Sequence, residues 1–410
     1  MPLSTSGIVR GRAPDLLSGK GFGQRVRRPA WRTRVKDNES VLLEAYQRFH
    51  QTGPEWGGHH LSNHGPMAVE AMIRHGHAGS VHHWIDNYTQ RLEEPPRGID
   101  PVTENDWREA LGDLKRVADW TTLFHREVTE RPWREVLATW WPRLVPGIAG
   151  GTAHGAIRVG HVVHSMLTAE ARAGSVDSIE NPYVTELADA LGYWAACWTP
   201  VTGDPSRRLG SLRPADALAN VPTVADQQKG VPYRLSQLPT TDGWQSALGA
   251  LRTVDDPEQV PALLSQLIDA TVFRYLSYGH GHAVMLVHAS TAPTAVLRVL
   301  PALPRRLWVP SLDAAWQATA ALTAACTPQL AADRADLTVH TNGVATTEDA
   351  MALAVDQGDE HVIKFADTAV ETFTRTGNKD ALAAASRCAE LITLTEAAGR
   401  ARFDGRGPTS

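Results

Sequence analysis

The sequence predicts an all-α protein, a large multi-helix bundle-like domain, and three observations support this prediction. Apolar residues recur at helical spacing from Ser40 onward. Runs that alternate apolar and polar residues, which are typical of half-buried strands, are short and few. Glycine and proline breaks separate the periodic segments, and no 34- or 40-residue repeat indicates a regular solenoid. The expected helices cover about 61–74, 79–92, 104–128, 132–144, 152–172, 183–198, 257–276, 278–303, 308–326, 346–357, 359–376 and 379–399.

The two ends of the chain lack the apolar pattern of its middle. Residues 1–38 carry nine basic residues and little apolar periodicity, which predicts a disordered basic N-terminal tail. Residues 39–400 are expected to form a single helical domain. Two lobes joined near 199–245 are the alternative, because that segment is the least periodic and is typical of a lid or a connection. Residues 401–410 are expected to be a flexible C-terminus.

The composition argues against several classes of protein. A net charge of −5 over 410 residues gives no reason to expect nucleic acid or an acidic membrane as a partner. The three cysteines, Cys197, Cys326 and Cys388, are widely spaced, so a disulfide framework and a cysteine zinc site are not expected. No apolar run approaches the roughly 20 residues of a membrane helix, and the N-terminus lacks the apolar stretch of a signal peptide. A cytoplasmic protein without a membrane partner is therefore expected.

Histidine is unusually frequent, with 17 residues, and the first two of four histidine-bearing patches follow glycine-rich loops. In the first patch, a loop that contains Trp56 leads into a helix near Asn63, so that His64 falls in the first turn, where ligands can approach. A capping or packing role is the simpler interpretation of this patch alone. In the second, His154, Arg158 and His161 stand at i, i+4 and i+7 and share one helix face. Two histidines and an arginine on one face are hard to bury without a function, and phosphate binding by the loop amides is a less favoured use.

The other two patches lie in the second half of the chain. His288 follows an apolar turn and should point inward, where its imidazole needs a partner. His361 and Lys364 stand at i and i+3 and share a face. Lys364 can extend its head into water. If it is desolvated instead, its lowered pKa suits a base or a nucleophile, and its neutral amine can take up CO2 to become a carbamate with an anionic oxygen.

Helical bundles build metal sites in their cores from side chains on separate helices, and neutral imidazoles suit iron, copper, zinc and nickel. The chain shows no HExxH, CxxC or GxSxG motif that would signal a zincin or a standard hydrolase. Spacing alone does not establish that the four patches converge.

Four segments of the chain together resemble the questin oxidase-like family, whose members open the quinone ring of anthraquinones in polyketide pathways. The segments are Ser62-Asn63-His64, Pro146-Gly147 through His154, His288-Ala289-Ser290-Thr291 and His361-Val362-Ile363-Lys364. In this order they cover most of the predicted folded region. A denser histidine run that fungal members carry after the Asn-His pair is replaced here by Gly65, Pro66, Met67 and Ala68, so the identity of the substrate stays open.

The resemblance implies a metal-dependent oxygenase that uses O2 to cleave a ring C–C bond of a polycyclic aromatic ketone or quinone. Baeyer–Villiger and dioxygenase outcomes are both compatible with it. From the ligand set given below, Fe(II) is the expected metal. NADPH is left open as a reductant, because some members are described as NADPH-linked, and no flavin motif is present. The implied metal ligands are His64, His154, His288, His361 and Lys364, the last as a carbamate. The candidate substrate-binding residues are Trp56, Asn63, Arg158 and His161, of which His161 is not part of the family pattern.

Two other functions stay open. A non-catalytic helical scaffold or ligand-binding protein would place the histidines on separate surfaces. A metal-dependent hydrolase with a carbamylated lysine would work without O2 and tolerate zinc. The oligomeric state is open as well.

Overall fold

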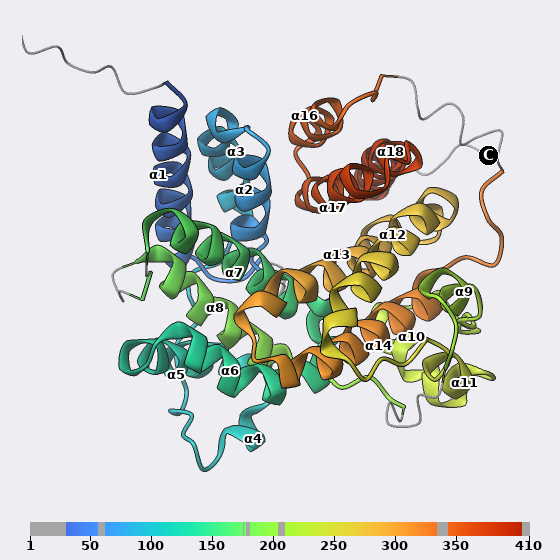
Figure 1. Ribbon diagram of the computed structural model, residues 1–410, viewed down its shortest axis with the longest axis horizontal. Coiled ribbons are helices and arrows are strands. Elements are labelled where there is room, and N and C mark those ends of the chain that lie inside the picture. The colour runs from blue at the N-terminus through green and yellow to red at the C-terminus, as the bar shows by residue number, and fades with distance from the viewer. Residues whose placement is uncertain are drawn as a thin grey trace, which may run out of the picture. The chain divides into compact units, whose positions relative to one another are not determined.

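The computed structural model of the chain describes residues 30–55, 62–174, 176–177, 181–203, 210–333 and 343–403. The all-α class is confirmed: within these ranges the regular elements are helices, and β structure is limited to isolated bridges. Figure 1 labels the α-helices. They are α1 (Ala30–His50), α2 (Gly65–Arg74), α3 (Val81–Tyr88), α4 (Trp107–Ala110), α5 (Val117–Glu130), α6 (Trp133–Leu144), α7 (His154–Ala173), α8 (Pro182–Cys197), α9 (Pro214–Ala219), α10 (Val231–Ser236), α11 (Trp244–Leu248), α12 (Val260–Tyr278), α13 (Ala283–Val299), α14 (Trp308–Cys326), α16 (Thr347–Gln357), α17 (Glu360–Thr376) and α18 (Asp380–Phe403).

The chain divides into two units, Met1–Asp37 and Asn38–Ser410. Of the first unit, only the helical residues from Ala30 onward are described. Helix α1 therefore begins before the expected end of the tail at residue 38, and the rest of that expected tail lies outside the described residues. At the other end, α18 continues to Phe403, slightly past the expected limit of the domain at residue 400.

Most predicted helices occur close to their expected limits, with two clear differences. The helix expected over 104–128 is broken, because the short α4 and a 3-10 turn precede α5. The described part of the weakly periodic segment 199–245 contains the short helices α9, α10 and α11, which contact α12 and α14. Trp244 and Leu248 of α11 are buried in the main hydrophobic core. This part of the segment is thus joined to the body of the protein by apolar burial.

Helices α2, α7, α13 and α17 form a closed ring of contacts that positions the histidines. Helix α2 contacts α7, α7 contacts α13, α13 contacts α17, and α17 contacts α2. Helix α7 also packs on α8, and α17 packs on α18, so the ring is enclosed by further helices. The four histidine-bearing patches of the sequence supply one helix each to this ring.

Helix α13 passes by length and composition as a segment that could cross a membrane, contrary to the expectation from the sequence. The segment Ala283–Ala302 has a mean hydropathy of 1.4 over its most apolar window. Yet 83% of that window is buried inside the protein. Helix α13 also contacts α12, α14 and α18, and a helix that is enclosed by protein in this way is apolar on most sides.

A glycine sets the close approach of α7 to α13. A Cβ atom built on Gly160 would lie 2.5 Å from the Cβ of Ala295 and 2.6 Å from its Cα. Backbone atoms of a packed helix cannot move away cheaply, so the contact has no room for a methyl group. The distance between two helices that carry predicted ligands therefore depends on this residue.

We expect Gly160→Ala to lower the free energy of unfolding by about 1–3 kcal/mol, because overpacking forces α7 away from α13. Urea unfolding followed by circular dichroism measures this change. Gly79→Ala is the matched control, since a Cβ on Gly79 meets nothing within 4 Å. Equal stability of the two variants would show that α7 and α13 do not need their close contact.

Candidate metal centre

The five predicted ligands come from the four helices of the ring, and three of them lie at helix N-termini. His64 immediately precedes α2, His154 is the first residue of α7, and His361 follows Glu360 at the start of α17. His288 lies inside α13, and Lys364 lies one turn after His361. All five are buried: the side chains of His288 and Lys364 have no exposed surface, and the other three are 3–8% exposed.

The four imidazoles meet in one place. The Nε2 atom of His154 lies 2.6 Å from Nε2 of His64 and 2.9 Å from Nε2 of His288. The ring of His361 lies 4.8 Å from the His64 ring and 5.3 Å from the His288 ring, measured between centroids. Ring nitrogens of His64, His154 and His361 all lie within 4.8 Å of one another, so this buried group could hold a metal ion.

Hydrogen bonds on the outer side of two rings assign their protons. Nδ1 of His64 lies 2.7 Å from a carboxylate oxygen of Glu55, and Nδ1 of His154 lies 2.5 Å from the backbone carbonyl of Gly151. Each Nδ1 is therefore the donor, because a carbonyl and an ionised carboxylate can only accept. In the neutral rings this leaves a lone pair on each Nε2. Such outer partners are the usual means of orienting metal-bound histidines.

The rings are also neutral. Burial lowers the pKa of His64 and of His154 well below the ordinary value, and neighbouring positive charges, among them Lys364, lower it further. Two lone pairs thus face each other at 2.6 Å without a proton between them. Two nitrogens bound about 2.1 Å from one ion at right angles lie about 3 Å apart. The donors are therefore of the type and close to the spacing that a first-row divalent metal requires.

Lys364 is the second unusual group of the site. Its Nζ is buried, and no described residue hydrogen-bonds to it. Burial lowers the pKa of Lys364 to about 8, although the nearby carboxylates of Glu360, Asp359 and Glu55 act in the opposite direction. The structure therefore contradicts a lysine that extends its head into water. A buried amine of this kind is neutral in part of the molecules near neutral pH.

Three carboxylates surround the imidazoles, and nothing in the sequence pattern pointed to the first of them. Glu55 accepts from His64 and from the hydroxyl of Tyr88, which in turn accepts from the backbone N–H of His64 at 2.6 Å. Asp359 and Glu360 lie 3.4 Å and 3.5 Å from Nδ1 of His361. Glu55 stands in an irregular segment, where no helical spacing relates it to His64.

The residues directly before His154 have an unusual backbone. Gly151, Thr152 and Ala153 have φ angles of 54°, 58° and 65°, and two of these residues carry a Cβ. A non-glycine residue in this left-handed region costs about 1–2 kcal/mol. The conformation places the Gly151 carbonyl against Nδ1 of His154. The strained backbone segment is therefore the one that orients the imidazole ring of His154, a predicted ligand.

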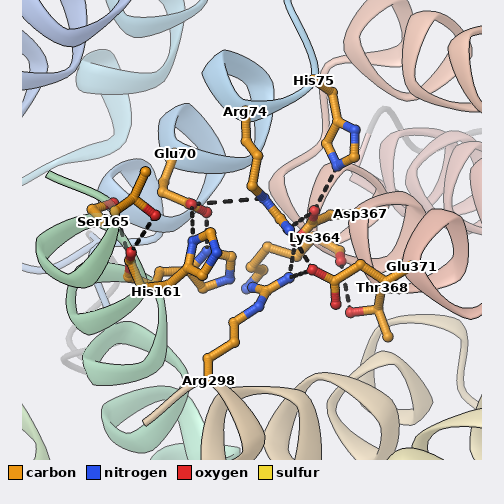
Figure 2. A network of polar contacts seen from close by, with 12 residues as sticks. Glu70, Arg74, His75, His161, Ser165, Arg298, Lys364, Asp367, Thr368 and Glu371 are labelled. Atoms are coloured by element: carbon orange, nitrogen blue, oxygen red, sulfur yellow. Dashed lines mark hydrogen bonds and ion pairs between the residues drawn. The ribbon is translucent and has the colours of Figure 1, made fainter. Parts of the chain in front are cut away.

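A largely buried polar network ties the four ring helices together, as Figure 2 shows. It contains Glu70 and Arg74 of α2, His161 and His164 of α7, Arg298 of α13, and Asp367 and Glu371 of α17. Glu70 accepts from His161 at 2.7 Å and from His164 at 2.9 Å. Asp367 accepts from Arg74, from Arg298 and from His75, which follows α2. Each helix is therefore fixed at two points, by this network and by its predicted ligand.

The predicted substrate-binding residues have different surroundings. His161 was expected on the wall of a substrate pocket, but its Nδ1 binds the buried Glu70, two turns away from His154 along α7. Arg158 forms two hydrogen bonds to Glu186, at 2.5 Å and 2.7 Å. Asn63 and Arg158 both line one cavity. Trp56 lies outside the described residues.

We expect Asp367→Asn to lower the free energy of unfolding by about 3–5 kcal/mol, because it leaves Arg74 and Arg298 short of a buried counter-charge. Urea unfolding measures this loss. The control is Asp216→Asn, which removes an exposed ion pair to Arg213 and should cost at most about 1 kcal/mol. A loss at Asp367 no larger than the loss at Asp216 would contradict a structural role for the network.

Comparison with known proteins supplies no relative: no family model matches the chain, and no curated protein matches it either. The four segments of the sequence and the site that they build are thus the whole basis for assigning a function.

Proposed function

We propose that the protein is a metal-dependent oxygenase that uses O2 to cleave a ring C–C bond of a polycyclic aromatic ketone or quinone. The proposal rests on one observation, the neutral Nε2 atoms of His64 and His154 that face each other at 2.6 Å, with His288 and His361 around them. Imidazole ligands suit a borderline metal such as Fe(II), which we propose as the ion.

The residues present fit such an ion. His64 and His154 already have the tautomer and the orientation of ligands, because Glu55 and the Gly151 carbonyl hold their outer nitrogens. The buried Nδ1 atom of His288 has no partner in the described part of the chain, so only the position of its Nε2 is fixed by a contact. When bound, iron would supply Lewis-acid activation and electrons for O2.

Lys364 would complete the donor set as a carbamate. Its neutral amine attacks CO2, an N–C bond forms, and one proton leaves the nitrogen for a nearby carboxylate, among Glu360, Asp359 and Glu55. The product carries an anionic oxygen, whereas an ammonium group has no lone pair to offer. A buried amine without a hydrogen-bond partner, with a pKa lowered to about 8, is suited to this reaction. The negative charge would also offset the charge of a divalent ion in the apolar interior.

The substrate class follows from the resemblance to the questin oxidase-like family, which rests on the four segments in their order. A small aromatic polyketide is therefore the proposed substrate, and Baeyer–Villiger and dioxygenase outcomes both stay open. The described residues contain no βαβ unit, which is the fold that usually binds a dinucleotide. NADPH therefore stays open as a reductant, but it would need another mode of binding.

Two alternatives predict other results. A scaffold would have its histidines on separate surfaces, whereas here four lie together in the interior. A metal-dependent hydrolase with a carbamylated Lys364 has the same donor set, but it turns over without O2 and accepts zinc. Purification in air and under nitrogen, followed by assays with each metal, separates the hydrolase from the oxygenase.

We expect His154→Ala and Lys364→Ala to lose iron about ten-fold or more and to lose ring cleavage, because each removes one donor. Elemental analysis of the purified proteins measures the metal, and mass spectrometry of a hydroxyanthraquinone reaction measures turnover. His83→Ala and Lys379→Ala, both at exposed positions, are the matched controls. Full metal loading and full turnover in both site variants would remove the proposal.

Carbamylation has its own expected signal. Protein incubated with 13C-bicarbonate should show a carbamate carbon in its NMR spectrum, and Lys364→Ala should lose that resonance while Lys379→Ala keeps it. The spectrum is recorded on protein loaded with diamagnetic zinc, because bound Fe(II) would broaden the signal. A spectrum without any carbamate in that protein would leave the four imidazoles as the donors and would overturn the role given to Lys364.

A further inference from the structure

A cavity of about 480 Å³ lies beside the metal centre, lined by residues of α1, α5, α7 and α8. This volume is within the range of sites for small organic ligands. Much of the lining is apolar, and it includes Phe49, Pro54, Pro95, Pro96, Val117 and Ala118. An apolar lining of this kind suits the faces of fused aromatic rings.

The inner wall of the cavity consists of immediate neighbours of the predicted ligands. Asn63 precedes His64 in the chain, and Arg158 lies one turn after His154 on α7. Tyr193 also lines the cavity, and its hydroxyl lies 2.8 Å from the position of a Cβ on Gly151. Because the Gly151 carbonyl orients His154, this part of the cavity wall lies next to a residue that holds a predicted ligand.

One polar cluster, formed by His50, His125 and Asp189, stands on the wall of the same cavity. Nδ1 of His50 lies 2.9 Å from one carboxylate oxygen of Asp189, and Nε2 of His125 lies 2.8 Å from the other. Asp189 thus fixes both rings, whose centroids are 5.1 Å apart. No described residue binds the remaining nitrogens, Nε2 of His50 and Nδ1 of His125. Each ring therefore has a free nitrogen with which it can meet a ligand.

The charges around the cluster favour a basic imidazole. Burial alone would raise the pKa of Asp189, but the hydrogen bonds from His125 and His50, together with Arg158, lower it to about 2. The carboxylate is therefore anionic. The hydrogen bond to Asp189 raises the pKa of His50, the charge of Glu186 acts in the same direction, and Arg158 opposes them. Arg158 and Glu186 pair with each other, so they largely cancel.

We propose that this cavity binds the aromatic substrate and that the cluster of His50, His125 and Asp189 takes the proton of an acidic phenolic hydroxyl on it. This inference rests on the proposed function and names the place of its substrate. In the step, the phenol O–H bond breaks, an N–H bond forms on a free imidazole nitrogen, and Asp189 stabilises the imidazolium. The product is a phenolate, whose electron-rich ring reacts more readily with an oxidant, and no electrons leave the protein or the ligand in this step.

A second cavity, of about 650 Å³, lies between α3 and α16 and is the main competitor. Its lining includes the polar or charged residues His77, His83, Asn87, Arg91, Asp356 and Asp359. Burying a fused aromatic system there would strip water from several polar groups without replacing their hydrogen bonds. The apolar cavity beside α5 suits such a ligand better.

The test uses 2-hydroxyanthraquinone, whose absorption changes when its hydroxyl ionises and whose single hydroxyl cannot chelate a metal with a neighbouring oxygen. We expect the protein as purified to bind this dye and to hold it as the phenolate at a pH where the free dye is still protonated. The double variant His50→Gln/His125→Gln should raise the pH midpoint of ionisation of the bound dye by about one unit. His83→Gln, at the competing cavity, should leave that midpoint unchanged.

Filling the cavity gives an independent measurement. Ala118→Phe places a ring in the apolar cavity and should weaken dye binding at least about ten-fold, whereas Ala352→Phe makes the same change in the competing cavity and should not. Wild-type binding by Ala118→Phe, or an unshifted midpoint in the histidine double variant, would overturn the proposal. Should Ala118→Phe fail to fold, the double variant decides, because His50 is exposed and His125 is only partly buried.

The same samples separate this inference from the proposed function. Iron content is measured on each preparation, and dye binding does not depend on turnover. If the dye binds and ionises as expected in protein that is purified without iron, the result supports the proposed substrate cavity and contradicts the proposed oxygenase function. If the protein contains iron but neither set of variants changes binding or ionisation of the dye, the result contradicts the proposed substrate cavity and leaves the proposed oxygenase function in place.

Discussion

The lone pairs of His64 and His154 point at each other across 2.6 Å in the interior of a helical protein. Their outer nitrogens are committed to Glu55 and to a backbone carbonyl, so neither ring can turn over and present a proton without losing a short hydrogen bond. Two facing acceptors repel each other unless a positive charge lies between or beside them. The arrangement of α2 and α7 is therefore costly unless a cation compensates, and the other parts of the site follow from this need.

The ring of four helices holds this repulsive arrangement in place. Glu70 accepts hydrogen bonds from imidazoles of α7, and Asp367 and Glu371 of α17 accept from Arg74 of α2 and Arg298 of α13, within a few turns of the predicted ligands. Burying so many charges costs a large desolvation free energy, which only their mutual hydrogen bonds offset. Apolar side chains of the same volume could have packed these helices equally well. The network instead fixes the register of the four helices relative to one another, and this register determines the position of each imidazole.

The sequence predicted the helices and the residues of the site better than it predicted how the residues are supported. Helical periodicity placed the four histidine-bearing patches on separate helices, and the resemblance selected the ligands among them. The imidazoles of His64, His154, His288 and His361 lie together. The support could not be predicted, because Glu55 and Glu70 meet their histidines through pairings between distant parts of the chain. His161 shows why residues on one helix face cannot be assumed to share a site. It lies on the same face of α7 as His154, but it is two turns further along the helix and contacts Glu70 instead. The break before α5 was missed because apolar spacing continued across it.

The closed ring has a consequence for how this protein would survive in a cell. Because each helix contributes a donor and no two donors are close in sequence apart from His361 and Lys364, a partly unfolded chain cannot retain the site. An ion that binds the folded state alone stabilises it by mass action, by about 2.7 kcal/mol when its free concentration is a hundred times the dissociation constant. If the proposed metal binds here, its supply would govern the abundance of the folded protein, because chains that unfold are open to proteolysis.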